Sequence, residues 1–315
     1  MNRRTLISLV VGAALAAGPA VAQAADPVVV PHDWADQVTA LDGTIVWAEG
    51  SQLMKRSPSG VIAPVPGAPL TSYSGIDLGR NAQGRVVLTY LRCTTVTKCD
   101  PYLDDLVGNT VALTGLAPRR CVLANAPSIW GSKMAYMLRC FKLKGRPGVP
   151  DATRSGLFVR IGFGAPRRLW LPDGTSRFDP NSPPRVDLRG TIVGAVVGAR
   201  NKLAITQTID ATRQRVARVA TQADGQYVTG MALDGSGVLW TVTQGYVGDG
   251  EDSYATDDVI SRLGAATCAD SESIPSEGST IRAAQAIAVD GATIYLTTTH
   301  SGIVSHVFMP TFTCS

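Results

Sequence analysis

The sequence has few of the residues on which familiar catalytic sites depend. Its 315 residues include only three histidines, His32, His300 and His306, and none belongs to an H-E-x-x-H zinc motif. The nucleophile patterns G-x-S-x-G and S-x-x-K are absent, as is the phosphate-binding pattern G-x-x-x-x-G-K-[ST]. The sequence therefore does not support a zinc hydrolase, a serine hydrolase or a P-loop nucleotidase. An enzyme is not the first expectation.

Charged residues are also scarce, and their signs nearly balance. Only 17% of the residues are charged, with 29 Lys and Arg against 25 Asp and Glu. This balance gives no reason to expect a nucleic-acid partner. Beyond the N-terminus, no apolar run approaches the roughly 20 residues of a membrane-spanning helix. The 32 glycines and 19 prolines, with 45% hydrophobic residues, instead predict a compact body of short strands and turns.

The N-terminus has the features of an export signal. Arg3 and Arg4 precede an apolar stretch over residues 5–18, and Ala22-Gln23-Ala24 offers the small residues of a cleavage site. We therefore predict a signal peptide over residues 1–24, a single domain over residues 25–315, and a secreted or periplasmic location. The paired arginines leave both the general secretory route and the twin-arginine route open.

One short pattern recurs along the rest of the chain. A glycine precedes an apolar, alternating stretch at intervals of about 40–60 residues. Period-2 alternation bounded by Gly, Pro and Asp is typical of strands in antiparallel sheets, and no sustained helical period occurs after the signal. Further strands are expected over residues 157–162, 202–208 and 258–263. The recurring glycines are Gly43, Gly84, Gly131, Gly190, Gly237 and Gly291.

A repeat of this length with four short strands is typical of a propeller blade. Six anchors predict an all-β protein, a six-bladed β-propeller of four-stranded antiparallel blades. Each repeated glycine would then mark the hairpin between the two inner strands of a blade, where φ is positive. The short apolar segment Asp26–Val30 is expected to complete the last blade and close the ring. A long β-sandwich is the alternative architecture.

The best-formed repeat resembles a known blade motif. Asp234-Gly-Ser-Gly237-Val-Leu-Trp240, followed by Thr-Val, is similar to the blade motif of the NHL and gluconolactonase-like six-bladed propellers. Asn81-Ala-Gln-Gly84-Arg-Val-Val is a weaker version, and the TolB-like propellers share the layout. The resemblance implies a propeller over nearly all of the mature chain. These families include binding modules, lactonases and lyases, so the resemblance does not imply one function.

Six cysteines form an even set in a chain expected to reach an oxidising compartment. Cys121 and Cys140 lie almost symmetrically about the Gly131 turn, so antiparallel strands would place them side by side. Cys93 and Cys99 flank a short loop in the same way. The predicted disulfides are therefore Cys93–Cys99, Cys121–Cys140 and, by elimination, Cys268–Cys314. No C-x-x-C pair is present to suggest a redox or metal site.

Three connections, at residues 94–106, 141–156 and 245–257, are expected to form long loops on one face of the propeller, where scaffolds commonly carry recognition. The last is rich in carboxylates, which could hold Ca²⁺ because hard oxygen ligands suit that ion. It lacks the spacing of an EF-hand, and a solvated acidic loop is the alternative. The candidate ligands are Asp249, Glu251, Asp252, Asp257 and Asp258.

The function predicted from these features is an exported binding or scaffold module for a protein or a cell-envelope ligand. The alternative is a Ca²⁺-assisted hydrolase or lactonase with carboxylates at the mouth of the central channel. That alternative requires acidic and amide side chains from several blades to converge on one pocket. The channel-side candidates Asp77, Asp187, Asp234 and Asp290 are interpreted as turn or strand-end residues.

Overall fold

The structure is a computed structural model. It describes residues 28–30, 37–95, 98–142, 151, 153–169, 185–197, 203–209, 215–218, 227–244, 246–247, 254–255, 258–263, 269–274, 286–298 and 302–306. Every regular element in these ranges is a β-strand. They contain no helix, and so no helix with the length and apolar character needed to cross a membrane.

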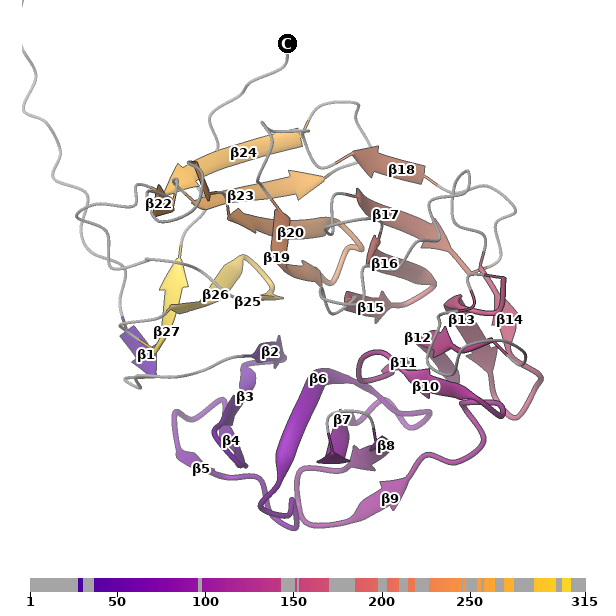
Figure 1. The fold of residues 1–315 in the computed structure, drawn as a ribbon. Helices are drawn as coiled ribbons and strands as arrows, with labels where there is room; N and C mark the ends of the chain where they lie inside the picture. The colour runs from indigo at the N-terminus through magenta and orange to yellow at the C-terminus, as the bar shows by residue number, and fades with distance from the viewer. Residues whose placement is uncertain are drawn as a thin grey trace, which may run out of the picture.

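The strands form six antiparallel blades arranged around a common centre, as predicted for a six-bladed propeller (Figure 1). A parallel pairing between Arg80 and Trp130 joins the second and third blades into one nine-stranded sheet. Each blade is given from its inner to its outer strand. The first blade consists of β2 (Val38–Leu41), β3 (Thr44–Glu49), β4 (Gln52–Arg56) and β5 (Ile62–Pro64), and the second of β6 (Ser72–Arg80), β7 (Val86–Thr95), β8 (Lys98–Asp104) and β9 (Thr110–Ala112). The third blade consists of β11 (Ser128–Trp130), β12 (Lys133–Cys140), β13 (Gly156–Ile161) and β14 (Arg167–Arg168). In the third blade, β10 (Cys121–Leu123) also pairs with β12.

The last three blades follow the same plan. They are β15 (Arg185–Arg189), β16 (Ile192–Val197), β17 (Leu203–Thr208) and β18 (Arg215–Arg218); β19 (Tyr227–Leu233), β20 (Leu239–Gln244), β23 (Asp258–Leu263) and β24 (Ala269–Ile274); and β25 (Ala286–Asp290), β26 (Thr293–Thr298), β27 (Gly302–His306) and β1 (Val28–Val30). The strands expected over residues 157–162, 202–208 and 258–263 are β13, β17 and β23.

The ring is closed by the N-terminal strand. β1 pairs antiparallel with β27, with Val28 opposite Val304, and so becomes the outer strand of the sixth blade. The sixth blade therefore combines both ends of the described chain. Residues from β1, β2, β3 and β25 then share one hydrophobic cluster between the sixth and first blades, with Trp47 1% exposed at its centre. The closure predicted from the short apolar N-terminal segment is confirmed.

The six repeated glycines occupy the turns between the first and second strands of their blades. All six have positive φ, between 61° and 81°. This left-handed conformation costs glycine little free energy, whereas it is strained for most other residues. The turns therefore explain why the same short pattern recurs, since each blade needs one tight link at the same place.

One predicted loop is wrong. Residues 94–106 were expected to form a long connection, but β7 continues to Thr95 and β8 begins at Lys98. The two strands form a hairpin in which Cys93 lies directly opposite Cys99. The polar composition of this segment suggested a loop, but β8 is a half-exposed strand in which polar residues occupy the exposed positions, such as Lys98 and Asp100.

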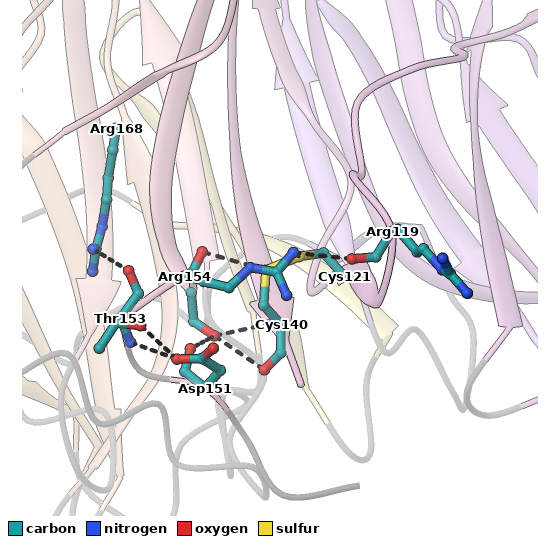
Figure 2. Close-up of a disulfide and its surroundings, with 8 residues drawn as sticks. Arg119, Cys121, Cys140, Asp151, Thr153, Arg154 and Arg168 are labelled. Carbon is teal, nitrogen blue, oxygen red and sulfur yellow. Dashed lines mark hydrogen bonds between the residues drawn. A yellow bond between two sulfur atoms is a disulfide. The ribbon is translucent and has the colours of Figure 1, made fainter. Parts of the chain in front are cut away.

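The structure contains the two disulfides predicted from hairpin symmetry, Cys93–Cys99 and Cys121–Cys140. Figure 2 shows the second, which joins β10 to β12. The Arg154 guanidinium donates to the Arg119 carbonyl at 3.0 Å, and the Asp151 N–H donates to the Cys140 carbonyl at 2.7 Å. The bridge is thus tied to the connection that follows β12. The predicted pair Cys268–Cys314 lies outside the described residues.

Candidate functional site

A cavity of about 280 Å³ lies where the inner strands of the six blades meet. Every blade contributes to its wall through its innermost strand or the residues next to that strand. Five of the contributing segments are parts of β2, β6, β15, β19 and β25, and the sixth is residues 124–126, between β10 and β11. One lining residue from each blade is Gln37, Asp77, Asn125, Arg185, Met231 and Val289.

Asp187 of β15 is held firmly in the wall of this cavity. The Ser128 hydroxyl donates to its Oδ1 at 3.4 Å, and the Leu233 N–H donates to its Oδ2 at 2.7 Å. The Arg189 guanidinium forms an ion pair with Oδ1 at 3.0 Å. The carboxylate is 5% exposed, and both of its oxygens have protein partners. Asp187 therefore joins the third, fourth and fifth blades at the centre of the ring.

Asp77 of β6 is the second carboxyl in the cavity, and its surroundings differ. It is 8% exposed, and its Oδ2 has no hydrogen-bond partner among the described residues. Burial raises the pKa of Asp77 well above its usual range, and the nearby Asp187 carboxylate adds to the rise, while Arg189 and a hydrogen bond from Ser128 oppose it. The two acids therefore differ in their interactions. Asp187 forms an ion pair with Arg189, whereas the surroundings of Asp77 favour its protonated form.

Amide and guanidinium groups complete the polar wall. Asn125 accepts a hydrogen bond from the Met137 N–H at 3.3 Å through Oδ1, which leaves its amide nitrogen as the donor end. The buried Oε1 of Gln37 has no hydrogen-bond partner among the described residues. Burial lowers the pKa of the Arg185 guanidinium to about 10, so this residue stays cationic at neutral pH. Donors and acceptors from four blades therefore line one cavity.

The cavity wall is supported from outside by Trp130. The Arg189 and Arg80 guanidinium carbons lie 5.4 Å and 5.6 Å from the centre of its ring, distances typical of cation–π contacts. Arg189 also donates to the Leu78 carbonyl at 2.9 Å. Arg189 is therefore fixed by a carbonyl, a carboxylate and an aromatic ring at the junction of the second, third and fourth blades.

Asp77 and Asp187 correct the sequence-based interpretation, which treated them as turn or strand-end residues. Both lie within inner strands and line the cavity. The interpretation holds for Asp234 and Asp290. Asp234 accepts from the Ser236 and Val238 N–H groups within its own turn. Asp290 accepts from two backbone N–H groups of the first blade's turn, at Asp42 and Gly43.

The acidic connection in the fifth blade lies mostly outside the described residues, which exclude Asp249, Glu251, Asp252 and Asp257. Asp258 is described; it is the first residue of β23 and is 4% exposed. No group of three or more His, Cys, Asp or Glu side chains that could hold a metal occurs in the described part of the chain. Of the histidines, only His306 is described, and its Nε2 lies 2.9 Å from Glu272 of the neighbouring blade.

A signal for the cavity was present in the sequence of β15. Arg185, Asp187 and Arg189 alternate with Val186 and Leu188, which belong to the apolar core. Charged residues at every second position of an innermost strand share one side of that strand. Here all three line the central cavity, where a buried charged row costs free energy unless it is paired. Such a row, together with a single acid on another inner strand, predicts a polar central site.

Replacing Asp77 by asparagine is expected to stabilise the protein at neutral and alkaline pH. Because the folded-state pKa of Asp77 lies above the unfolded value of about 4, its stabilising contribution is complete below that value and is lost as the pH rises through the folded-state pKa. At pH 8, Asp77→Asn should raise the free energy of unfolding by about 1–3 kcal/mol. The gain should shrink toward pH 4.

Urea unfolding of both proteins across this pH range measures the effect, with Asp100→Asn, at an exposed position of β8, as the control. A gain that is constant with pH, or equal in the control, would contradict the assignment.

No protein family profile matches this chain, and no curated protein is detectably similar in sequence. Solved structures do resemble it. A gluconolactonase from Xanthomonas campestris superposes with a TM-score of 0.53 at 14% identity, covering 87% of this chain and 86% of that one. A luciferin-regenerating enzyme gives 0.51 at 12% identity, covering 87% and 91%.

An Aleuria aurantia lectin in complex with a methyl fucoside gives a TM-score of 0.50 at 9% identity, covering 87% of this chain and 94% of the lectin. These proteins include enzymes and a sugar-binding protein, so the likeness extends to the fold alone. With six four-stranded blades closed by an N-terminal strand, the chain is a six-bladed β-propeller.

Proposed function

We propose that this propeller is an exported binding module that holds a small polar ligand of the cell envelope in its central cavity. The observation that carries the proposal is the convergence of polar side chains from four blades on one space. Asp77 and Gln37 each present a buried oxygen without a hydrogen-bond partner among the described residues. Leaving such an atom unpaired costs about 1–3 kcal/mol, a cost that a bound ligand would remove.

One end of the cavity wall lies at the starts of the inner strands, on the face whose connections the sequence associates with recognition. Gln37, Tyr73 and Arg185 lie at the starts of inner strands. Because successive strands of a blade run in opposite directions, the link between the second and third strands emerges on this same face. The disulfide-closed hairpin of β7 and β8 lies there, as does the small hairpin of β21 (Tyr246–Val247) and β22 (Tyr254–Ala255). A ligand would enter between these connections.

An extracytoplasmic location is consistent with the two disulfide bonds. Two disulfides are typical of an oxidising compartment, and the apolar segment over residues 5–18 is of the kind that directs export. The proposal therefore places the binding site outside the cytoplasm, where the ligand would be a free small molecule or an exposed part of the cell envelope.

A hydrolase is the second candidate function, and one observation favours it. Asp77 and Asp187 lie close enough to interact, and burial raises the pKa of Asp77, so it can act as a proton donor beside the ion-paired Asp187. A Ca²⁺-assisted version fits the cavity poorly. Both oxygens of Asp187 are engaged, and Arg185 and Arg189 bring two positive charges to the place where the ion would bind. The acidic connection at residues 249–258 remains a predicted Ca²⁺ site.

The binding proposal is tested by thermal unfolding and calorimetry of the mature protein with a panel of sugars, sugar acids, lactones and amino acids. At least one class should raise the melting temperature. Gln37→Ala should weaken the binding of that ligand about tenfold, since it deletes an acceptor that has no hydrogen-bond partner among the described residues. The matched control is Gln83→Ala, in an exposed turn.

Equal affinities of Gln37→Ala and Gln83→Ala would place the site elsewhere, and a panel without any binder would defeat the proposal. Product analysis of the lactones after incubation separates the two candidate functions. Turnover that is abolished by Asp77→Asn would favour the hydrolase.

A further inference from the structure

The exposed apolar side chains gather at one kind of turn, the link between the third and fourth strands of a blade. This link is described in the first three blades, at residues 57–61, 105–109 and 162–166. These links and the strand ends beside them carry every large apolar side chain that is exposed in the described part of the chain, except Leu70. We call this set the apolar rim; it consists of Val61, Ile62, Val107, Val111, Ile161 and Phe163.

The three links of the apolar rim lie on one face of the ring. Because successive strands of a blade are antiparallel, the third-to-fourth link emerges on the same face as the glycine turn between the first two strands. In the third blade, a hydrogen bond from the Gly162 N–H to the Ser132 carbonyl at 2.7 Å joins these two turns. The first, second and third blades follow one another around the ring (Figure 1). The apolar rim is therefore a row of three neighbouring tips, opposite the face where the cavity ligand would enter.

Each tip satisfies backbone groups within its own turn. The Ser57 N–H donates to the Val61 carbonyl at 2.9 Å, and the Gly164 N–H donates to the Ile161 carbonyl at 3.1 Å. In the second blade, the Asp105 carboxylate accepts from two backbone N–H groups of its own link. An unpaired backbone group is costly in an apolar medium. These turns can therefore enter a less polar environment without losing the hydrogen bonds that hold them.

Cationic side chains flank the apolar rim. Lys133 lies directly opposite Ile161 across the β12–β13 pair, so the two side chains are neighbours. Arg160 precedes Ile161 in β13, and the exposed Arg167 begins β14 just after the link. Arg85 is exposed in the glycine turn of the second blade, on the same face. The rim of the third blade is therefore bordered by positive charge.

The described acids on this face of the first three blades are already engaged. Asp42 forms an ion pair with Arg80. Asp104 is buried and accepts from the Leu106 N–H and the Thr110 hydroxyl, and Asp105 is bonded within its own link. Although the charges of the whole chain nearly balance, this face presents cations beside exposed apolar groups. That combination suits an anionic partner with an apolar interior.

A lipid surface matches the apolar rim better than a folded protein does. A stable protein interface takes roughly 20–30 residues from each side, whereas the rim offers a few apolar side chains on separate turns. Phe163 is 99% exposed, so it contacts almost nothing of its own protein. A protein would need a preformed pocket for each such tip, but a lipid layer deforms around it. Aromatic rings are favoured at the membrane–water interface, and basic residues are attracted to anionic headgroups.

We propose that the protein docks on an anionic lipid surface through the apolar rim. Phe163 and its apolar neighbours enter the interfacial layer, while Lys133, Arg85 and the arginines beside the third link contact lipid phosphates. The opposite face, with the entrance to the central cavity, then stays open to solution. This inference goes beyond the proposed ligand binding and does not depend on it, because the residues that it uses do not line the cavity.

The test is co-sedimentation of the mature protein with vesicles of phosphatidylglycerol and phosphatidylcholine in equal parts, and with vesicles of phosphatidylcholine alone. The anionic vesicles should bind at least about tenfold more tightly, and raising the salt from about 0.05 M to about 0.5 M should weaken that binding. Phe163→Ser should weaken it about tenfold. The matched control is Leu70→Ser, which is 73% exposed but lies outside the rim and should bind as the wild type does.

Two further variants separate insertion from charge. Phe163→Trp should show a blue shift of its emission on adding anionic vesicles, relative to the wild type. Lys133→Gln combined with Arg85→Gln should weaken binding to anionic vesicles at least about tenfold, whereas Lys142→Gln, exposed at the other end of the third blade, should not. Melting curves without vesicles establish that each variant is folded, and the wild-type comparison of the two vesicle types is decisive even where one is not.

Three results would overturn the proposal. One is no binding of the wild type to anionic vesicles at low salt. Another is equal binding by Phe163→Ser and Leu70→Ser, which would mean that the apolar rim is not used. The third is a dimer in sedimentation velocity that Phe163→Ser abolishes, which would assign the rim to a second copy of the chain. None of these results bears on the central cavity, so the proposed ligand binding would stand or fall on its own test.

Discussion

Replacing Arg189 by methionine is expected to lower the free energy of unfolding by about 3–5 kcal/mol. The guanidinium is 5% exposed and forms an ion pair with Asp187 at 3.0 Å, so its removal leaves a buried carboxylate without its counter-charge. The substitution also deletes a hydrogen bond to the Leu78 carbonyl and a contact with the Trp130 ring. Three blades would lose a common anchor, which makes this the largest effect that we expect from a single side chain.

Chemical denaturation of the mature protein at pH 7 measures the loss, with Arg85→Met as an exposed control that should change stability by less than about 0.5 kcal/mol. Adding Asp187→Asn to Arg189→Met should recover part of the stability, because it removes the uncompensated charge. A loss of less than about 1 kcal/mol in the free energy of unfolding would show that the ion pair does not stabilise the junction of these blades. A double variant no more stable than Arg189→Met would show the same.

The architecture was largely predictable because it depends on a local pattern repeated many times. Each blade needs one tight turn with positive φ, and glycine supplies it at six places from Gly43 to Gly291. The closing strand could also be predicted, since Val28–Val30 is short, apolar and close to the expected start of the mature chain. Hairpin symmetry identified Cys121 and Cys140 as neighbours for the same reason, because contacts across a turn are close in sequence.

The candidate site was much harder to predict, because its residues come together only when the ring closes. Asp77 and Asp187 are far apart in sequence and belong to the second and fourth blades, and aspartate is also a common turn residue. Their shared environment depends on the angle between blades, which no local pattern records. The carboxylates in the sequence drew attention to residues 249–258, whereas the buried Oδ2 of Asp77, which has no partner among the described residues, belongs to a residue that lines the central cavity.

The polar cavity and the stability of the ring are two aspects of one arrangement. Asp187 and Arg189 join the blades at the centre, and both act on Asp77, because the Asp187 carboxylate raises its pKa and the Arg189 guanidinium lowers it. Stability is therefore supplied by groups adjacent to Asp77, which the proposed ligand would contact. Variants of Arg189 should alter both unfolding and binding, whereas variants of Gln37 should alter binding alone.

Removal of the Cys121–Cys140 disulfide is expected to lower the free energy of unfolding by about 3 kcal/mol, and removal of Cys93–Cys99 by about 2 kcal/mol. The difference follows from loop length, since the first bridge joins cysteines 19 residues apart in sequence and the second joins cysteines only 6 apart. A longer closed loop restricts the unfolded chain more. The first bridge also anchors the segment that carries Asp151 and Arg154, as Figure 2 shows.

The two paired alanine variants, Cys121→Ala/Cys140→Ala and Cys93→Ala/Cys99→Ala, serve as matched controls for one another. Each removes two sulfur atoms from the same cluster between the second and third blades, so the lost burial is comparable and the loop lengths differ. Denaturant unfolding with and without a reductant separates the covalent effect from the packing effect. With a reductant all bridges are open, so the wild type and a variant differ in packing alone. The additional difference seen without a reductant is the covalent effect. A larger loss for Cys93–Cys99 would mean that local packing of the hairpin, rather than restriction of the unfolded chain, determines what these disulfides contribute.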